Sequence, residues 1–381
     1  MTQHLIVAAV AAAITALLTP FVRNGARRWG AVDVPEDRKV HKLPTPTSGG
    51  IAIYAGVLVG VIVARFLPAF HDLFTSSTEP VGVMLAATLI CGLGVVDDVR
   101  GMKAPTKLAG QILACGALVL GGVSIFYFWM PGVGVLGLSP DLSALITVIW
   151  AVAVINALNL VDGLDGLAAG VTTIAAGTLF VYAYRSGGGE GTAATLIPAL
   201  IVGSCIGFLP HNFNPAKIFM GDSGSMLLGL LLASSTVSGV GRTVEPTASD
   251  AVGLIVPVLL PFFVLAIPLA DAGFAIMRRM RARTPVFHAD KSHIHHWLLE
   301  MARSHRQAVI VMYLWSAMVA AAALVLSLGD GSGLRYAAIG IGLVLIVSIL
   351  VLPRLLRRGA VWMAELREMD AAPTVPHEAA E

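Results

Sequence analysis

The stretch AATLIPALIVGSCIGFLP, at residues 193–210, contains no charged side chain. A bilayer core of about 30 Å is crossed by roughly 20 helical residues, within a usable range of about 17 to 25. This stretch therefore predicts a membrane-spanning helix, and similar windows recur along the whole chain. The predicted spans are residues 4–22, 48–67, 81–97, 107–124, 142–160, 165–184, 193–210, 224–241, 251–277, 307–328 and 335–352.

The composition of the whole chain supports the same conclusion. Of its 381 residues, 56% are hydrophobic and 13% charged, whereas soluble domains have about 45–50% and about 25%. A net charge of +2 without a basic stripe argues against nucleic-acid binding. Cys91, Cys115 and Cys205 lie singly in apolar stretches, which indicates neither a disulfide framework nor a cysteine zinc site. We predict an all-α polytopic membrane protein with about eleven spans.

The basic residues predict how the chain is oriented. With eleven spans, every Lys and Arg falls on one side of the membrane except Arg65, Arg185, Arg242 and Arg335. Basic residues are retained on the cytoplasmic side, so we expect the N-terminus outside and the C-terminus in the cytoplasm. The first span follows no basic segment and precedes no clear cleavage site, which indicates a retained helix. Residues 1–367 are expected to form one integral-membrane domain, and residues 368–381 a disordered cytoplasmic tail.

Five polar clusters interrupt the apolar pattern, all on the predicted cytoplasmic side. A carboxylate at the centre of a spanning helix costs about 2.5–3.5 kcal/mol on insertion scales, so acids beside apolar runs need a reason. We expect the five clusters to assemble one site. They are residues 42–50, Asp97-Asp98 with Lys107, residues 156–166, residues 211–225 and residues 290–296.

Asp97 and Asp98 end the third predicted span. Neighbouring side chains on a helix diverge by about 100°, so the two acids are expected to have different roles. One interpretation is that they only end the helix and face water. Acids at a helix C-terminus oppose the macrodipole, however, which favours a functional role.

Asn156, Asn159, Asp162 and Asp165 recur every three residues, which would place them on nearly one helix face. Their oxygens suit a hydrated Mg²⁺, a pyrophosphate or sugar hydroxyls. The alternative is a polar seam between helices.

Asp222 lies between two glycines, just before a small-residue helix that is expected to begin near Gly224. A helix N-terminus favours anions, and Asp222 offers a hard oxygen to Mg²⁺. A plain turn in which Asp222 caps its own helix is the alternative.

The last polar motif, His293-Ile-His-His296, lies among Arg and Lys residues. These surroundings suit phosphate better than zinc. A solvated loop held at anionic lipid headgroups is the alternative.

Together and in this order, the motifs from Lys42 to His296 resemble the polyprenyl-phosphate N-acetylhexosamine-1-phosphate transferases of glycosyltransferase family 4. The resemblance implies transfer of a sugar phosphate from a UDP-sugar to a polyprenyl phosphate at the cytoplasmic face of the plasma membrane. UMP would be released, and Mg²⁺ would be used, with Mn²⁺ as a substitute. Ile294 interrupts the three consecutive histidines usual in the muramoyl branch, so the chain looks like the N-acetylglucosamine branch. The expected substrates are UDP-N-acetylglucosamine and undecaprenyl or decaprenyl phosphate.

The resemblance also implies roles for individual residues. Asp222 looks like the principal Mg²⁺ ligand, and Asp162 and Asp165 would face metal and nucleotide. Asp97 and Asp98 would deprotonate or orient the lipid phosphate. Asn212 and Phe219 would line the nucleotide pocket, the histidines would hold the sugar diphosphate, and the lysines would contact phosphate. The residues expected to bind substrate are Lys42, Lys107, Asn156, Asn159, Asn212, Phe219, His293, His295 and His296.

Two rival functions and two mechanisms stay open on the sequence. The first rival is the muramoyl-pentapeptide branch of the same family. The second is a transporter, although this chain shows neither the midplane polar groups nor the repeated halves typical of that class. A direct attack by the lipid phosphate and a two-step route through an aspartyl intermediate are both compatible with the motifs, and so is a homodimer.

Overall fold

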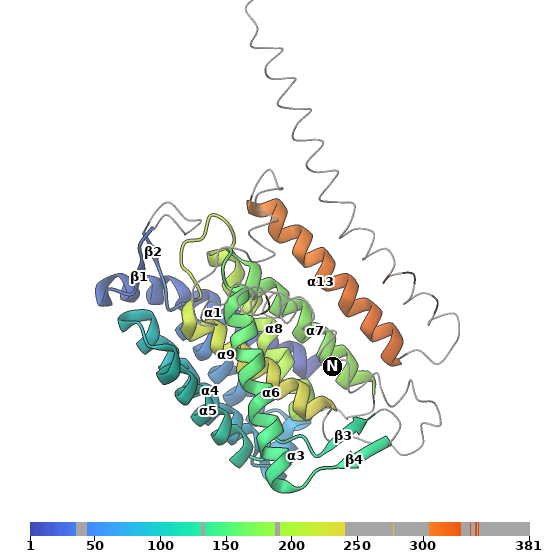
Figure 1. The fold of residues 1–381 in the computed structure, drawn as a ribbon. Coiled ribbons are helices and arrows are strands. Elements are labelled where there is room, and N and C mark those ends of the chain that lie inside the picture. Colours follow the sequence, from blue (N-terminus) through green and yellow to red (C-terminus); the bar gives the residue numbers. More distant parts are fainter. Residues whose placement is uncertain are drawn as a thin grey trace, which may run out of the picture.

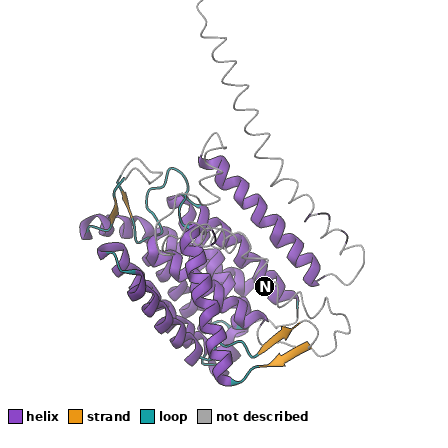
Figure 2. Cartoon of the chain, in the orientation of Figure 1, coloured by secondary structure: helices purple, strands orange, loops and turns teal. Residues whose placement is uncertain are grey.

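The computed structural model describes residues 1–35, 44–130, 134–186, 191–240 and 305–328, together with residues 277, 336, 340 and 342. The described chain is mostly helical (Figures 1 and 2). The long helices are α1 (Thr2–Trp29), α2 (Gly50–Arg65), α4 (Glu79–Arg100), α5 (Ala104–Leu120), α6 (Pro140–Val161), α7 (Leu167–Arg185), α8 (Ala193–Asn212), α9 (Gly221–Val240) and α13 (His305–Leu328). The short elements are η1 (Pro68–Phe70), α3 (His71–Ser76), β1 (Val32–Asp33), β2 (Thr45–Pro46), β3 (Tyr127–Met130) and β4 (Gly134–Gly137).

The prediction of a polytopic helical membrane protein is confirmed in its coarse form. In the described part of the chain, six helices are long and apolar enough to cross a membrane: α1, α4, α6, α7, α8 and α13. The number becomes seven if α2 and its bent continuation count as one span. The predicted spans at 251–277 and 335–352 lie almost wholly outside the described residues. The total of eleven and the direction of the termini therefore stay predictions.

Two features of the fold differ from the prediction. The span predicted over 48–67 ends at Arg65, and the helix axis then bends by 90° into η1 and α3. Leu67 is extended, as expected for a residue that precedes a proline, and Pro68 begins η1. Two antiparallel strand pairs, β1–β2 and β3–β4, also occur in connections where no strand was predicted.

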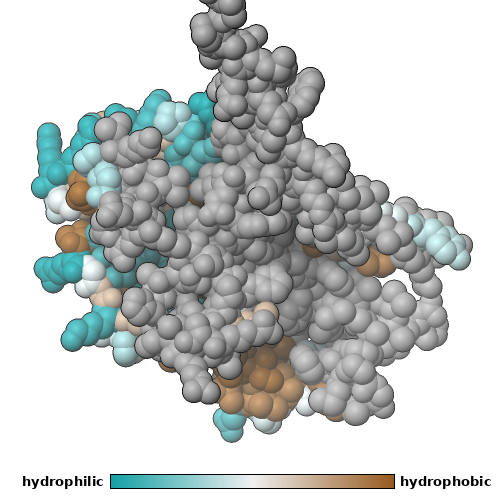
Figure 3. All heavy atoms as spheres, turned by 45° about the horizontal axis from the view of Figure 1, so that its top comes forward, coloured by the Kyte–Doolittle hydropathy of each residue, from teal (hydrophilic) through white to brown (hydrophobic). Residues whose placement is uncertain are grey.

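The outer helices present apolar side chains to the surroundings. Leu17, Phe21, Val81, Leu113 and Ile149, from α1, α4, α5 and α6, are all more than half exposed. Figure 3 shows hydrophilic residues along its upper left edge and an apolar area lower down. Exposed apolar surface of this extent is typical of a membrane or partner contact, and its spread over several outer helices fits contact with lipid.

Helix α9 forms the centre of the bundle. It packs against α2, α4, α6, α7 and α8, and the side chains of residues 226–233 are almost completely buried. Its sequence is apolar or small on every face, which is typical of a helix with no exposed side.

Glycines bring the neighbouring helices unusually close to the start of α9. A Cβ added at Gly94 of α4 would lie 2.3 Å from the Cα of Ser223. One added at Gly50 of α2 would lie 2.1 Å from the backbone nitrogen of Gly224. Small residues permit such backbone contact in membrane bundles. The position of the first turn of α9 therefore depends on these two glycines.

We expect Gly94→Ala to destabilise the protein by about 1–3 kcal/mol, because the added methyl overpacks a contact between two backbones. Gly92→Ala is the matched control, since a Cβ at Gly92 meets nothing within 4 Å on the same helix. That control should be neutral or stabilising by up to about 1 kcal/mol. Thermal unfolding in detergent measures both variants, and equal effects would contradict the close α4–α9 contact.

Candidate functional site

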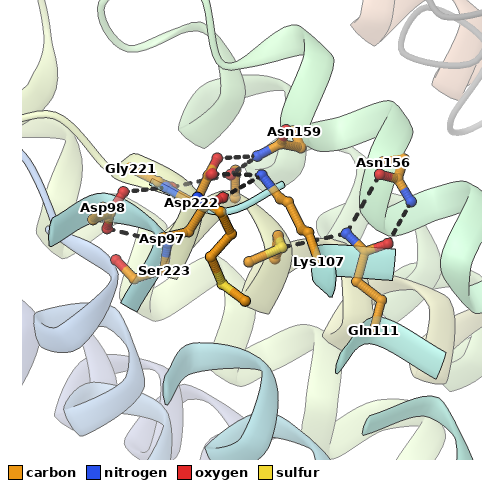
Figure 4. A network of polar contacts seen from close by, with 12 residues as sticks. Asp97, Asp98, Lys107, Gln111, Asn156, Asn159, Gly221, Asp222 and Ser223 are labelled. Atoms are coloured by element: carbon orange, nitrogen blue, oxygen red, sulfur yellow. Dashed lines mark hydrogen bonds and ion pairs between the residues drawn. The ribbon is translucent and has the colours of Figure 1, made fainter. Parts of the chain in front are cut away.

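Four helix ends meet at one end of the bundle and carry a group of polar side chains. The C-terminal ends of α4 and α6 and the N-terminal ends of α5 and α9 supply them (Figure 4). We call this group the carboxylate cluster. It consists of Asp97, Asp98, Lys107, Asn159 and Asp222.

Asp222 lies at the centre of the carboxylate cluster, in the first turn of α9. Its Oδ2 lies 2.5 Å from the Nζ of Lys107, which is also 2.9 Å from the Oδ2 of Asp97. Its Oδ1 accepts a hydrogen bond of 2.5 Å from the Nδ2 of Asn159, which also donates to the Oγ of Ser225 at 2.9 Å. Lys107 and Asn159 therefore contact Asp222 directly, and Asp97 is linked to it through Lys107, as predicted for residues of one site.

Asp98 caps the N-terminus of α9 from a different helix. Its Oδ1 accepts the backbone N–H of Asp222 at 2.8 Å, and its Oδ2 accepts that of Ser223 at 3.3 Å. The first N–H groups of a helix have no partner within the helix and carry partial positive charge. The sequence predicted that this helix N-terminus favours an anion, and the Asp98 carboxylate is the anion bound there. The helix begins at Gly221 instead of near Gly224.

Asp97 points in another direction, as predicted for adjacent side chains on a helix. Its Oδ1 accepts the backbone N–H of Met102 at 2.5 Å, just beyond the end of α4. Its Oδ2 faces Lys107. The chain turns at Gly101, whose φ of 66° is in the left-handed region that glycine adopts without strain.

The Asn156–Asp165 stripe does not lie on one helix face, because α6 ends at Val161. Asn159 reaches the carboxylate cluster, whereas Asp162 and Asp165 lie in the following turn. Asn156 instead forms a reciprocal amide pair with Gln111 of α5, with hydrogen bonds of 2.7 and 3.3 Å. Gln111 was not among the residues predicted for the site. Its signal is a lone amide in an apolar run, one helical turn after Lys107.

Asp165 and Asn212 hold two connections together. The Oδ2 of Asp165 accepts from the Nδ2 of Asn214 at 2.8 Å and from the backbone N–H of Ala216 at 3.0 Å. The Oδ1 of Asn212 accepts from the backbone N–H of Gly166, and its Nδ2 donates to the carbonyl of Ile218, both at 3.0 Å. These contacts join the α6–α7 and α8–α9 connections, so both residues have a structural part in the site.

Helix α13 reaches the same two connections from far along the chain. The hydroxyl of Tyr313 donates to the carbonyl of Gly166 at 2.5 Å, and the Nε of Arg306 donates to the carbonyl of Asn214 at 2.9 Å. A small hydrophobic cluster lies beneath these bonds, with Leu164 from the connection and Trp315 from α13 among its members. The sequence predicted this helix only as a span, since a lone Tyr and Arg at its start carry no recognisable motif.

Phe219 lies beside the segment that leads into α2. Its backbone N–H donates to the carbonyl of Pro46 at 2.8 Å, and its carbonyl accepts from the N–H of Gly49 at 3.0 Å. Ser48, in the same segment, has a φ of 68°, which is uncommon for a residue with a Cβ. Residues with such backbone angles are often found near functional sites, because surrounding contacts must hold the backbone in this unfavourable conformation.

Asp162 experiences only negative charge from the ionisable groups that act on it in the described part of the chain. Burial, followed by the charges of Asp222, Asp98 and Asp165, raises the pKa of Asp162 to about 8. A cation close to these carboxylates would restore the ionised form of Asp162. The acids therefore suit a positively charged ligand.

The described residues fit a magnesium ion. They contain no group of three or more Asp, Glu, His or Cys side chains arranged for a metal. Mg²⁺, however, usually binds through one or two carboxylates together with water and substrate phosphates. Asp222, with the carboxyl group of Asp162 nearby, meets that requirement. Lys42, His293, His295 and His296 lie outside the described residues, so their predicted roles stay predictions.

This chain is similar in sequence to several known proteins. Residues 80–240 match the family model described as glycosyl transferase family 4. The chain is 41% identical over 368 residues to a decaprenyl-phosphate N-acetylglucosaminephosphotransferase of Mycobacterium tuberculosis, covering 93% of this chain and 89% of the relative. It is 34% identical over 324 residues to a probable undecaprenyl-phosphate N-acetylglucosaminyl 1-phosphate transferase of Bacillus subtilis, covering 85% of each.

A third relative carries the name of the muramoyl branch. The phospho-N-acetylmuramoyl-pentapeptide-transferase of Desulforudis audaxviator is 35% identical over 263 residues. That similarity covers 62% of this chain and 76% of the relative.

We expect Asp98→Ala to destabilise the protein by about 1–2 kcal/mol, because it leaves the first N–H groups of α9 without their cap. Asp98→Asn should lose less, since its amide oxygen can still accept one of the two bonds. Asp72→Ala removes an exposed acid from the first turn of α3 and serves as the control. Thermal unfolding measures all three variants. Equal losses for the Ala and Asn variants at position 98 would contradict the capping role.

The raised pKa of Asp162 predicts a pH-dependent stability. The unfolded chain ionises this carboxyl near its usual pKa of about 3.9, whereas the folded chain ionises it at about 8. Its contribution to stability is therefore complete below about pH 4 and is lost as the pH rises through 8. With EDTA present, the wild type should lose more thermal stability than Asp162→Asn between about pH 5 and about pH 9. Parallel pH profiles for the two proteins would contradict the raised pKa.

Proposed function

Because this chain belongs to glycosyl transferase family 4, we propose that it transfers N-acetylglucosamine 1-phosphate from UDP-N-acetylglucosamine to a polyprenyl phosphate. The observation that carries the proposal is the similarity to transferases named for N-acetylglucosamine, which covers 93% of this chain for the mycobacterial relative. Relatives named for the muramoyl-pentapeptide reaction are less similar: one is 35% identical over 62% of this chain, and another is 29% identical over 87%. The name of the Mycobacterium tuberculosis relative also favours decaprenyl phosphate as the acceptor.

The reaction brings two anions together. The lipid phosphate attacks the β-phosphorus of the UDP-sugar, the bond from that phosphorus to the bridging oxygen breaks, and UMP leaves. Asp222, with Asp162 nearby, would hold Mg²⁺, which when bound neutralises charge on the diphosphate. Lys107 supplies further positive charge, because its ammonium lies beside Asp222. Positioning and charge stabilisation are the main tasks of a site for phosphoryl transfer.

The two adjacent acids of α4 have different parts in this proposal. Both oxygens of Asp98 accept backbone N–H groups of α9, so Asp98 positions Asp222. Asp97 faces Lys107 and the centre of the carboxylate cluster, which favours Asp97 as the group that orients or deprotonates the lipid phosphate. The sequence predicted different roles for the two acids without saying which acid has which role, and this proposal assigns them. It is compatible with direct attack by the lipid phosphate, the mechanism that we favour.

The location of the carboxylate cluster supports chemistry at a membrane boundary. Its residues lie at the ends of apolar helices, where a lipid acceptor in the bilayer and a nucleotide in water can meet. The distribution of Lys and Arg along the chain favours the cytoplasmic face of the plasma membrane.

The decisive experiment gives the purified protein decaprenyl phosphate in detergent with either UDP-N-acetylglucosamine or UDP-N-acetylmuramoyl-pentapeptide. We expect UMP and a labelled lipid product only with the first sugar nucleotide. We also expect EDTA to abolish the reaction. Product from the second nucleotide alone would assign the muramoyl reaction instead. A transporter would form no lipid product in detergent, where there are no compartments.

Asp222→Asn should lower turnover by about 10²–10³-fold, the loss typical of removing one group that stabilises transition-state charge. Asp141→Asn is the matched control, because Asp141 is an exposed acid at the opposite end of α6. Its turnover should equal that of the wild type. Full activity of Asp222→Asn, or activity in EDTA, would refute the proposed metal site.

A further inference from the structure

Lys107 occupies an unusual position for a cation. It lies in the first turns of α5, where the positive end of the helix dipole disfavours positive charge. Its ammonium is held there between two carboxylates, 2.9 Å from Asp97 and 2.5 Å from Asp222. The side chain is 17% exposed. Its charge is therefore directed at the acids of the carboxylate cluster instead of at solvent.

The carboxylate oxygens that Lys107 contacts are also the atoms to which a divalent ion would bind. One oxygen of Asp222 accepts from Asn159 and the other faces Lys107. A metal ion on the second oxygen competes directly with the ammonium for that atom. The two cations also repel each other at contact distance, and a partly buried site screens this repulsion only weakly.

We propose that Lys107 is an internal cation that a divalent metal displaces from Asp222, and that the released ammonium then binds the diphosphate of the nucleotide. This inference rests on the proposed function, because that function supplies the metal and the diphosphate. Lysine suits such a change of partner, since its compact charge is carried on a flexible stem. The arrangement neutralises part of the negative charge of Asp97 and Asp222 before the substrate binds. It also explains how Lys107 can contact carboxylates in the structure and still serve phosphate, as its motif predicts.

A purely structural ion pair makes a different prediction. If Lys107 only holds α5 against α4 and α9, its removal distorts the carboxylate cluster, and binding of metal and nucleotide both weaken. If Lys107 competes with the metal, its removal strengthens metal binding and weakens nucleotide binding. The opposite signs of the two effects separate these explanations.

The test measures Mn²⁺ binding to the purified full-length protein in detergent, from the electron paramagnetic resonance signal of free Mn²⁺. We expect Lys107→Met to bind Mn²⁺ about tenfold more tightly than the wild type, because a repelling charge is removed. Lys107→Arg keeps the charge and should resemble the wild type. Lys103→Met removes a charge from an exposed residue at the start of the same helix, and should change the affinity by less than about twofold.

A second measurement follows the nucleotide. At saturating Mn²⁺, we expect UDP to bind Lys107→Met about tenfold more weakly than the wild type, because the cation that would contact the diphosphate is missing. UDP binding to Lys103→Met should be unchanged. If Lys107→Met does not fold, Lys107→Gln provides the same charge removal and keeps a hydrogen-bond donor for the carboxylates.

Unchanged or weaker Mn²⁺ binding by the neutral variants would overturn the displacement of Lys107. So would tighter Mn²⁺ binding with unchanged UDP binding, because the released ammonium would then have no role at the diphosphate. The assay of UMP release by the wild type tests the proposed function separately. A wild type that forms product but fails the two binding tests would retain its function and lose only this inference.

Discussion

The hydrogen bonds from the start of α9 to the Asp98 carboxylate are the contact on which the rest of the site depends. They join the end of α4 to the beginning of α9, in which residues 223–237 are all buried. The contact requires close approach of backbones, which Gly94 and Gly50 permit. It also orients Asp222, whose own backbone N–H is one of the two donors, toward Lys107 and Asn159. A helix N-terminus that would attract a free anion is instead neutralised by a fixed one.

Charge balance is the second constraint on this end of the bundle. Three acids of α4 and α9, with Asp162 and Asp165 nearby, face one lysine within the described residues. Burying such an excess of like charge beside apolar helices is unfavourable unless a cation joins it. The proposed metal ion would supply that cation. Lys107 therefore has a part in both the stability of the site and its proposed chemistry.

Contacts far from the carboxylate cluster support its two connections. Asp165 and Asn212 tie the α6–α7 connection to the α8–α9 connection, and α13 adds Tyr313 and Arg306 from outside. Residues that resemble substrate ligands by motif thus also hold backbone in place. Substituting them would affect the shape of the site as well as any direct contact with the nucleotide.

The amino-acid sequence by itself determined most of the helices and the end of the bundle at which the polar residues gather. Both follow from local pattern, since apolar length sets each span, and successive spans must reverse direction. Only the tertiary structure decided which side chains meet. Asp97 pairs with Lys107, whereas Asp98 accepts hydrogen bonds from α9. Asn156 pairs with Gln111, which was not predicted, and α6 ends at Val161, before Asp162. These pairings depend on how each helix is rotated and where it ends against its neighbours, and periodicity within one helix carries no information about either.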